Sequence, residues 1–157
     1  MSSSNEVDLQ GTLLHTRRVA QLMSLAVQSL LQRAVSHDES KLHSPEAELF
    51  AAHTQSLKYL TYGSPTYEAA RRELAPALTH HYANNPHHPE HYPEGIEGMS
   101  LIDLLEMLLD WRAATERHDN GDIRHSIEIN QARYGYNDAL KKIFLNTLEQ
   151  LDLLPKE

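Results

Sequence analysis

A histidine next to an aspartate, at His37-Asp38, is the first feature of the sequence that could do chemistry. Neighbouring imidazole and carboxylate groups can offer a nitrogen and an oxygen to one divalent cation. A further histidine, His15, lies 22 positions before His37. In one straight helix these two histidines would be ~33 Å apart, at 1.5 Å per residue, and could not share an ion.

A reversal of the chain near Ser29 would remove that obstacle. Ser29 is followed three residues later by Gln32, which is typical of a helix start. We therefore expect two helices joined at Ser29, with His15 and His37-Asp38 at the same end as metal ligands. The alternative is a single long helix that carries unrelated surface histidines.

Three carboxylates occupy one face of an otherwise apolar segment, residues 101–111. Asp103, Glu106 and Asp110 are spaced i, i+3 and i+7 in a stretch that we expect to be helical and buried. Because buried carboxylates are unfavourable unless they are paired or metal-bound, a cation or arginines should face them. We predict Asp110 as a ligand, with Asp103 as the alternative, and Glu106 as an acid, a base or an orienting group. The other interpretation is a solvent-exposed polar stripe.

The chain is rich in histidine, with 11 histidines against 14 lysines and arginines. Histidine is the commonest metal ligand and titrates near neutral pH. Five histidines lie between positions 80 and 91. Four of them could hold a second metal ion or a phosphate, and the alternative is a solvated loop; they are His80, His81, His87 and His88.

Helices must position these residues, because no segment shows the alternation of apolar and polar residues that is typical of a strand. Residues 84–99 contain three prolines and two glycines and are expected to form a long loop. We predict an all-α fold of about seven helices, as one domain over residues 9–157 after a flexible tail at 1–8. The expected helices cover roughly residues 9–27, 30–37, 45–63, 65–83, 100–119, 123–133 and 138–153.

The composition excludes several classes of function. The chain has no cysteine, which excludes disulfides, thiolate zinc sites and cysteine nucleophiles. Its formal net charge of −8 argues against a long nucleic-acid partner. It has no apolar run near the ~20 residues of a membrane span and no signal peptide. We expect a cytoplasmic protein that binds a small ligand or a protein partner, and a homo-oligomer stays open.

Taken together, the motifs resemble the HD-domain phosphohydrolase superfamily. Its members bind a divalent metal through a first-helix histidine, a consecutive His-Asp and a later helical aspartate. The likeness covers roughly residues 10–118, and Ser40 departs from the glycine that usually precedes the lysine. The later part is similar to an uncharacterised, often phage-encoded branch, in His80-His81, Asn85-Pro86-His87-His88, Glu106-Met107 and Asp110-Trp111.

The resemblance implies an HD-type fold that hydrolyses a phosphate ester of a small nucleotide. Its metal, one or two ions of Mn, Co, Ni, Mg, Fe or Zn, would activate a water molecule. The implied ligands are His15, His37, Asp38 and Asp110. Asp38 would also position the water, Lys41 would stabilise phosphate oxygens, and Glu106 or a histidine would protonate the leaving oxygen.

Three other functions compete with this one. A cyclic or signalling nucleotide phosphodiesterase would use two metal ions on the same scaffold. A non-catalytic binding or regulatory protein would keep the metal for stability alone. A helical interaction module would hold no metal.

Overall fold

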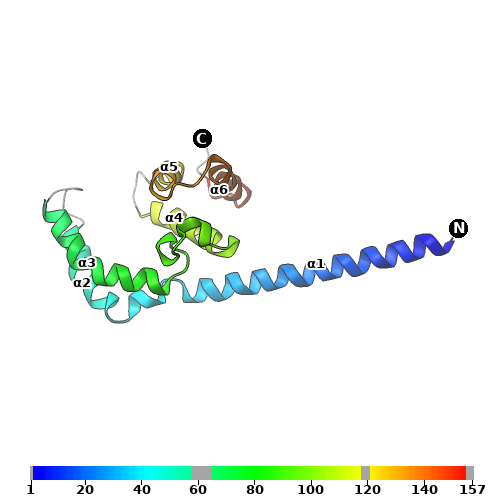
Figure 1. Cartoon of the computed structure of the whole chain (residues 1–157), viewed down its shortest axis with the longest axis horizontal. Coiled ribbons are helices and arrows are strands. Elements are labelled where there is room, and N and C mark those ends of the chain that lie inside the picture. The colour runs from blue at the N-terminus through cyan, green and yellow to red at the C-terminus, as the bar shows by residue number, and fades with distance from the viewer. Residues whose placement is uncertain (1, 58–64, 118–120, 155–157) are drawn as a thin grey trace. The chain divides into compact units, whose positions relative to one another are not determined.

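The computed structural model describes residues 2–57, 65–117 and 121–154 of the chain (Figure 1). All regular elements in these ranges are helical, and no strand occurs among them, so the predicted all-α class is confirmed. None of the helices described is long and apolar enough to cross a membrane. The elements are α1 (Ser2–Ser36), η1 (Glu39–Leu42), α2 (Glu46–Leu57), α3 (Pro65–Asn84), η2 (Pro89–His91), η3 (Gly95–Gly98), α4 (Leu101–Thr115), α5 (Ile123–Tyr134) and α6 (Asp138–Gln150), where η is a 3-10 helix.

The chain divides into two compact units, residues 1–37 and residues 38–157, here called the N-terminal and C-terminal units. The N-terminal unit consists of α1, which begins at Ser2, inside the segment expected to be a tail. The C-terminal unit contains all the other elements. The division between the units therefore falls inside the predicted metal-binding pair, between His37 and Asp38.

The predicted chain reversal at Ser29 is wrong, because α1 is one unbroken helix (Figure 1). Serine is compatible with a helix interior when its hydroxyl bonds to the carbonyl four residues earlier. Ser24 donates in this way to the Ala20 carbonyl at 2.8 Å, and Ser36 donates to the Gln32 carbonyl at 3.1 Å. No glycine or proline interrupts residues 12–36, so nothing in this stretch stops the helix.

The C-terminal unit has its apolar core where α4, α5 and α6 pack together. Trp111 of α4 stacks on Tyr134 and meets the edge of Phe144, with ring centroids 6.2 and 6.0 Å apart. α4 and α6 begin near residues 100 and 138, as predicted: Ser100 forms a capping box with Asp103, and Asn137 caps α6. The buried core residues are Met107, Leu108, Ile123, Ile127, Tyr136, Phe144 and Leu148.

Elsewhere in this unit, α2 packs against α3 and η1. α3 continues through Pro76 as one helix, although proline usually kinks or breaks a helix interior. The expected loop at 84–99 is irregular apart from η2 and η3, and it is fastened to its neighbours. His91 Nδ1 lies 2.7 Å from the Tyr82 carbonyl, and Tyr92 donates to the Asp103 carboxylate at 2.9 Å. The segment that carries His87 and His88 is therefore held at its far end.

Candidate metal centre

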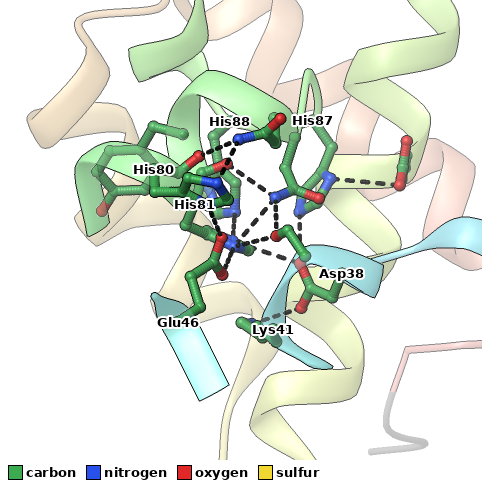
Figure 2. Close-up of polar contacts among 12 residues, drawn as sticks. Asp38, Lys41, Glu46, His80, His81, His87 and His88 are labelled. Carbon is green, nitrogen blue, oxygen red and sulfur yellow. Dashed lines mark hydrogen bonds and ion pairs between the residues drawn. The ribbon is translucent and has the colours of Figure 1, made fainter. Parts of the chain in front are cut away.

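The centre is organised around the carboxylate of Asp38, at the turn that begins η1 (Figure 2). Asp38 has φ 56° and ψ 18°, a left-handed conformation that aspartate tolerates better than most residues. Its carboxylate makes no capping bond to η1. Instead, Lys41 Nζ donates to Asp38 Oδ2 at 2.5 Å. Strained backbone of this kind tends to occur at functional sites, where it fixes the direction of a side chain.

Two buried histidines meet the other oxygen of the same carboxylate. His81 Nε2 is 3.3 Å from Asp38 Oδ1, and His87 Nε2 is 3.5 Å from it. The side chain of His81 is 3% exposed and that of His87 is 1% exposed. His81 comes from the last turn of α3 and His87 from the segment that follows. Two imidazole nitrogens from different elements thus converge on one oxygen.

Each of these histidines is held from behind by a further carboxylate. Glu46, in the first turn of α2, is fully buried and places Oε2 2.8 Å from His81 Nδ1. Glu106, on α4, places Oε1 3.3 Å from His87 Nδ1. A carboxylate on Nδ1 fixes the ring and leaves Nε2 as the metal-binding nitrogen, which is the usual arrangement of histidine ligands in metal sites.

Glu46 also binds a second histidine. Its Oε1 lies 2.7 Å from His80 Nδ1, so one buried carboxylate bridges two consecutive histidines. Burial acts to raise the pKa of Glu46, but hydrogen bonds with His80, Ser40 and His81 outweigh it and lower the pKa below its ordinary value. The group is therefore an anion near neutral pH, as a carboxylate that orients metal ligands should be.

His88 is the third histidine of the centre. Its Nε2 lies 2.9 Å from His81 Nε2, and its ring centroid is 4.2 Å from that of His87. Burial, and then the nearby His87 and His81, lower the pKa of His88 to about 3. Its imidazole is therefore neutral near pH 7, and neutral imidazole is the form that binds metal ions.

Asn85 and Ser40 complete the support of His81. Asn85 Nδ2 donates to the Ser40 hydroxyl at 2.7 Å and to the His81 carbonyl at 2.8 Å. The Ser40 hydroxyl is itself 3.3 Å from His81 Nδ1. Serine at position 40, where a glycine was expected from the family resemblance, thus has a role in the hydrogen bonding of the site.

Four ligand atoms of the centre lie within 4.8 Å of one another, one each from Asp38, His81, His87 and His88. We call these four residues the Asp38 cluster. A set of three nitrogens and one carboxylate oxygen suits zinc and the neighbouring transition metals. All four residues belong to the C-terminal unit. The ligand atoms of the cluster, and the carboxylates of Glu46 and Glu106 behind its histidines, therefore fit a divalent ion.

The sequence assigned these residues to two sites, and the structure groups them into one. His81, His87 and His88, which we predicted as a second metal or phosphate site, lie around Asp38. His80 stands at the edge of the cluster, with 37% of its side chain exposed.

The carboxylates of α4 have separate roles. Glu106 contacts His87, and Asp110 acts electrostatically on His88 by raising its pKa against the larger effect of burial. Asp103 Oδ2 accepts hydrogen bonds from Ser100 and from Tyr92. Of the two aspartates weighed as a ligand, Asp103 is thus used to cap α4, and Asp110 is the one whose charge reaches the cluster.

His15 requires a correction. It lies 21 residues before Ser36 on the unbroken helix α1, which is ~32 Å along the helix axis. The turn that was to bring it beside His37 does not exist, so His15 and His37 of one chain do not share an ion. His37 is joined to Asp38 through the backbone, and its role as a ligand stays a prediction.

Sequence reasoning missed Glu46, the fully buried carboxylate behind His80 and His81. It follows Ser44-Pro45, a common helix start, where an acidic residue is ordinary because it complements the helix dipole. The one sequence signal was that Glu46 precedes a stretch of mostly apolar and small residues. That pattern does not distinguish a buried acid from an exposed one.

No curated protein and no solved structure matches the chain. The model of one protein family matches residues 5–152, a range that includes every residue of the Asp38 cluster and its supporting carboxylates. The chain therefore belongs to that family, described as a family of unknown function (DUF5662).

Proposed function

We propose that the Asp38 cluster binds a divalent transition-metal ion and uses it to hydrolyse a phosphate ester of a small nucleotide. One observation carries the proposal. The Nε2 atoms of His81 and His87 converge on Asp38 Oδ1, while a separate carboxylate holds each Nδ1. Three neighbouring imidazoles and a carboxylate whose ligand atoms lie this close together form a donor set that is typical of transition-metal sites.

The charges around the cluster favour the same conclusion. Three carboxylates contact its histidines, from Asp38, Glu46 and Glu106, and a fourth, from Asp110, acts on His88. Lys41 is the cation that bonds to Asp38. Because His88 is neutral near pH 7, it does not offset these anions. A divalent cation among the four ligand atoms would do so.

Each residue then has a defined part in the hydrolysis. A bound metal ion lowers the pKa of a water ligand and polarises a phosphoryl group. Asp38 binds through Oδ1 and can orient the attacking water. Lys41, 41% exposed and bonded to Asp38 Oδ2, is placed to contact phosphate oxygens as a point charge.

Proton delivery falls to the edge of the cluster. His80 is partly exposed and bonded to Glu46, so it can reach a leaving oxygen while its ring stays oriented. Glu106 contacts His87 and would act by positioning that ligand, which is the orienting role among the three that the sequence left open.

The first experiment measures metal and activity together. Full-length protein purified without chelators should contain about one equivalent of a transition metal by elemental analysis. With manganese, cobalt or nickel added, it should release phosphate from members of a nucleotide panel. Asp38→Ala should remove the metal and the activity while the helical circular dichroism stays unchanged.

The control is a histidine outside the cluster. His81→Ala should reduce metal content at least about tenfold, as expected when a ligand is lost. His125→Ala, an exposed residue of α5, should leave both metal and activity unchanged. A protein whose His81→Ala variant retains full metal would refute the site. Full metal without turnover would favour a non-catalytic protein, and two equivalents would favour a phosphodiesterase.

A further inference from the structure

The N-terminal unit carries a long apolar seam that nothing within that unit can cover. Its positions are separated alternately by four and three residues, an average of 3.5, which is the repeat of a coiled coil. We call these positions the α1 seam; they are Leu9, Leu13, Thr16, Ala20, Met23, Val27, Leu30 and Ala34.

Most of the larger side chains of the seam are exposed, and Leu30 is half-buried. Leu13, Met23 and Val27 are 62%, 65% and 54% exposed. A single helix cannot bury its own face, and helices of this kind owe their stability to packing on another element. The one polar member is satisfied, because the Thr16 hydroxyl donates to the Thr12 carbonyl at 2.9 Å. The seam can therefore be covered without leaving a polar group unbonded.

We propose that α1 pairs in antiparallel orientation with α1 of a second copy of this chain. In an antiparallel pair, residues whose numbers add up to 43 face each other, and every seam position then finds a partner in the seam. Ala20 faces Met23 of the second copy, and Leu9 faces Ala34. Leu13 faces Leu30, and Thr16 faces Val27, which has the same branched shape.

Side-chain volume favours this orientation over the parallel one. In two of these pairs, Ala20 with Met23 and Ala34 with Leu9, an alanine faces a large side chain. This combination fills the space between the helices evenly. A parallel pair would stack Ala20 on Ala20 and Ala34 on Ala34, and these narrow layers would leave gaps beside the leucine layers. The helix dipoles would also run in the same direction in a parallel pair, which is less favourable than opposite directions.

Charge and size are consistent with a second copy as the partner. At the flanks of the antiparallel pair, Arg17 falls beside Ser24 of the second copy, and Arg33 falls beside Thr12 of the second copy. Neither arginine therefore meets a like charge there. The seam spans residues 9–34, about 39 Å of a helix about 10 Å wide. Counted over both copies this flat strip covers roughly 800 Å², which is the size of a weak, reversible interface.

Adjacent leucines provide a matched test. Leu13 lies in the seam and Leu14 lies on another face, yet they are 62% and 60% exposed. Sedimentation equilibrium of the full chain should show a dimer. Leu13→Lys should raise the dissociation constant at least about hundredfold, because it removes a packed leucine twice per dimer. Leu14→Lys should change it less than about threefold. Monomeric wild-type protein, or equal effects of the two variants, would overturn the proposal.

The absence of cysteine allows a separate test of orientation. Leu9→Cys and Ala34→Cys are made singly, checked for helical circular dichroism, and oxidised alone and as a mixture. The antiparallel pair predicts a disulfide between the two different variants in the mixture and none in either variant alone. Disulfide dimers of each variant alone would indicate a parallel pair, and no cross-linking in any sample would also contradict the register.

Discussion

Glu46 shows how one side chain can control the chemistry of several others. It is 0% exposed and contacts His80 and His81 through its two oxygens. An isolated buried carboxylate is strongly unfavourable, and here the histidine contacts compensate for the lost hydration. The same contacts fix the tautomer of His81 with hydrogen on Nδ1, so that the Nε2 lone pair faces Asp38. Glu46 thus determines which nitrogen of His81 would be available to a metal ion.

Replacing this carboxylate by an amide tests its role. Glu46→Gln keeps the shape of the side chain but removes the charge, and we expect metal affinity to fall about 10–100-fold. Affinity is measured by competition with a chelator of known strength. Glu48→Gln, the other acid in the first turn of α2, is exposed and should leave affinity unchanged. Equal losses in both variants would mean that net charge, and not the contact with His81, is responsible.

At the level of the elements, local signals predicted much of the C-terminal unit. The helices predicted to begin near residues 100 and 138 do so, with a capping box of Ser100 and Asp103 and a cap at Asn137. These signals succeed because cap and helix are neighbours in the sequence, so that a few residues determine the bonds.

The capping box of α4 leads to a stability prediction. The Ser100 hydroxyl donates to Asp103 Oδ2 at 2.6 Å and accepts from the Asp103 amide at 3.2 Å. Ser100→Ala should therefore lower the free energy of unfolding by about 1–2 kcal/mol, the upper part of the range for N-cap serines. Urea denaturation measures this change in the free energy of unfolding. Ser126→Ala, inside α5, should stay within about 0.5 kcal/mol of wild type. A smaller loss for Ser100→Ala than for Ser126→Ala would contradict the cap.

The same local reasoning failed for α1 and for the grouping of the ligands. Ser29 and Gln32 match a helix start, but no breaker accompanies them, and the helix continues. The cluster combines Asp38 with His81, His87 and His88, which are more than 40 positions away along the chain. Residue types predicted metal chemistry, whereas only the packing of α2 and α3 against η1 determines which residues meet.

At the scale of the whole molecule, the apolar core and the polar cluster draw on different parts of the chain and share one helix, α4. The core is formed by α4, α5 and α6, while the cluster draws on η1, α3 and the segment after it. α4 belongs to both, since Met107 lies in the core and Glu106 contacts His87. A change in the core can therefore reach the cluster through this helix.

The core gives the stability of the C-terminal unit a predictable dependence on pH. Burial raises the pKa of Tyr136 to about 12, and its hydroxyl donates to the Ile127 carbonyl at 2.6 Å. The unfolded chain would lose this proton near pH 10. The contribution to stability is thus complete below pH 10 and is lost as the pH rises from about 10 to 12.

Urea midpoints measured between pH 9 and pH 12 test this assignment. They should fall more steeply in wild-type protein than in Tyr136→Phe. Some slope should remain in the variant, because burial, together with Glu90, also raises the pKa of Tyr134. Identical slopes would show that Tyr136 does not titrate differently in the folded and unfolded states.

The anchoring of the segment at 84–99 has a consequence for how an ion would be used. Its contacts to Tyr82, to Asp103 and, through Glu90, to Arg133 are made within the chain and involve no residue of the Asp38 cluster. Little ordering of the chain would then accompany ion capture, so capture would neither require nor report a change of shape. Such preorganisation suits a permanently held cofactor and is a poor basis for a sensor of fluctuating metal concentration.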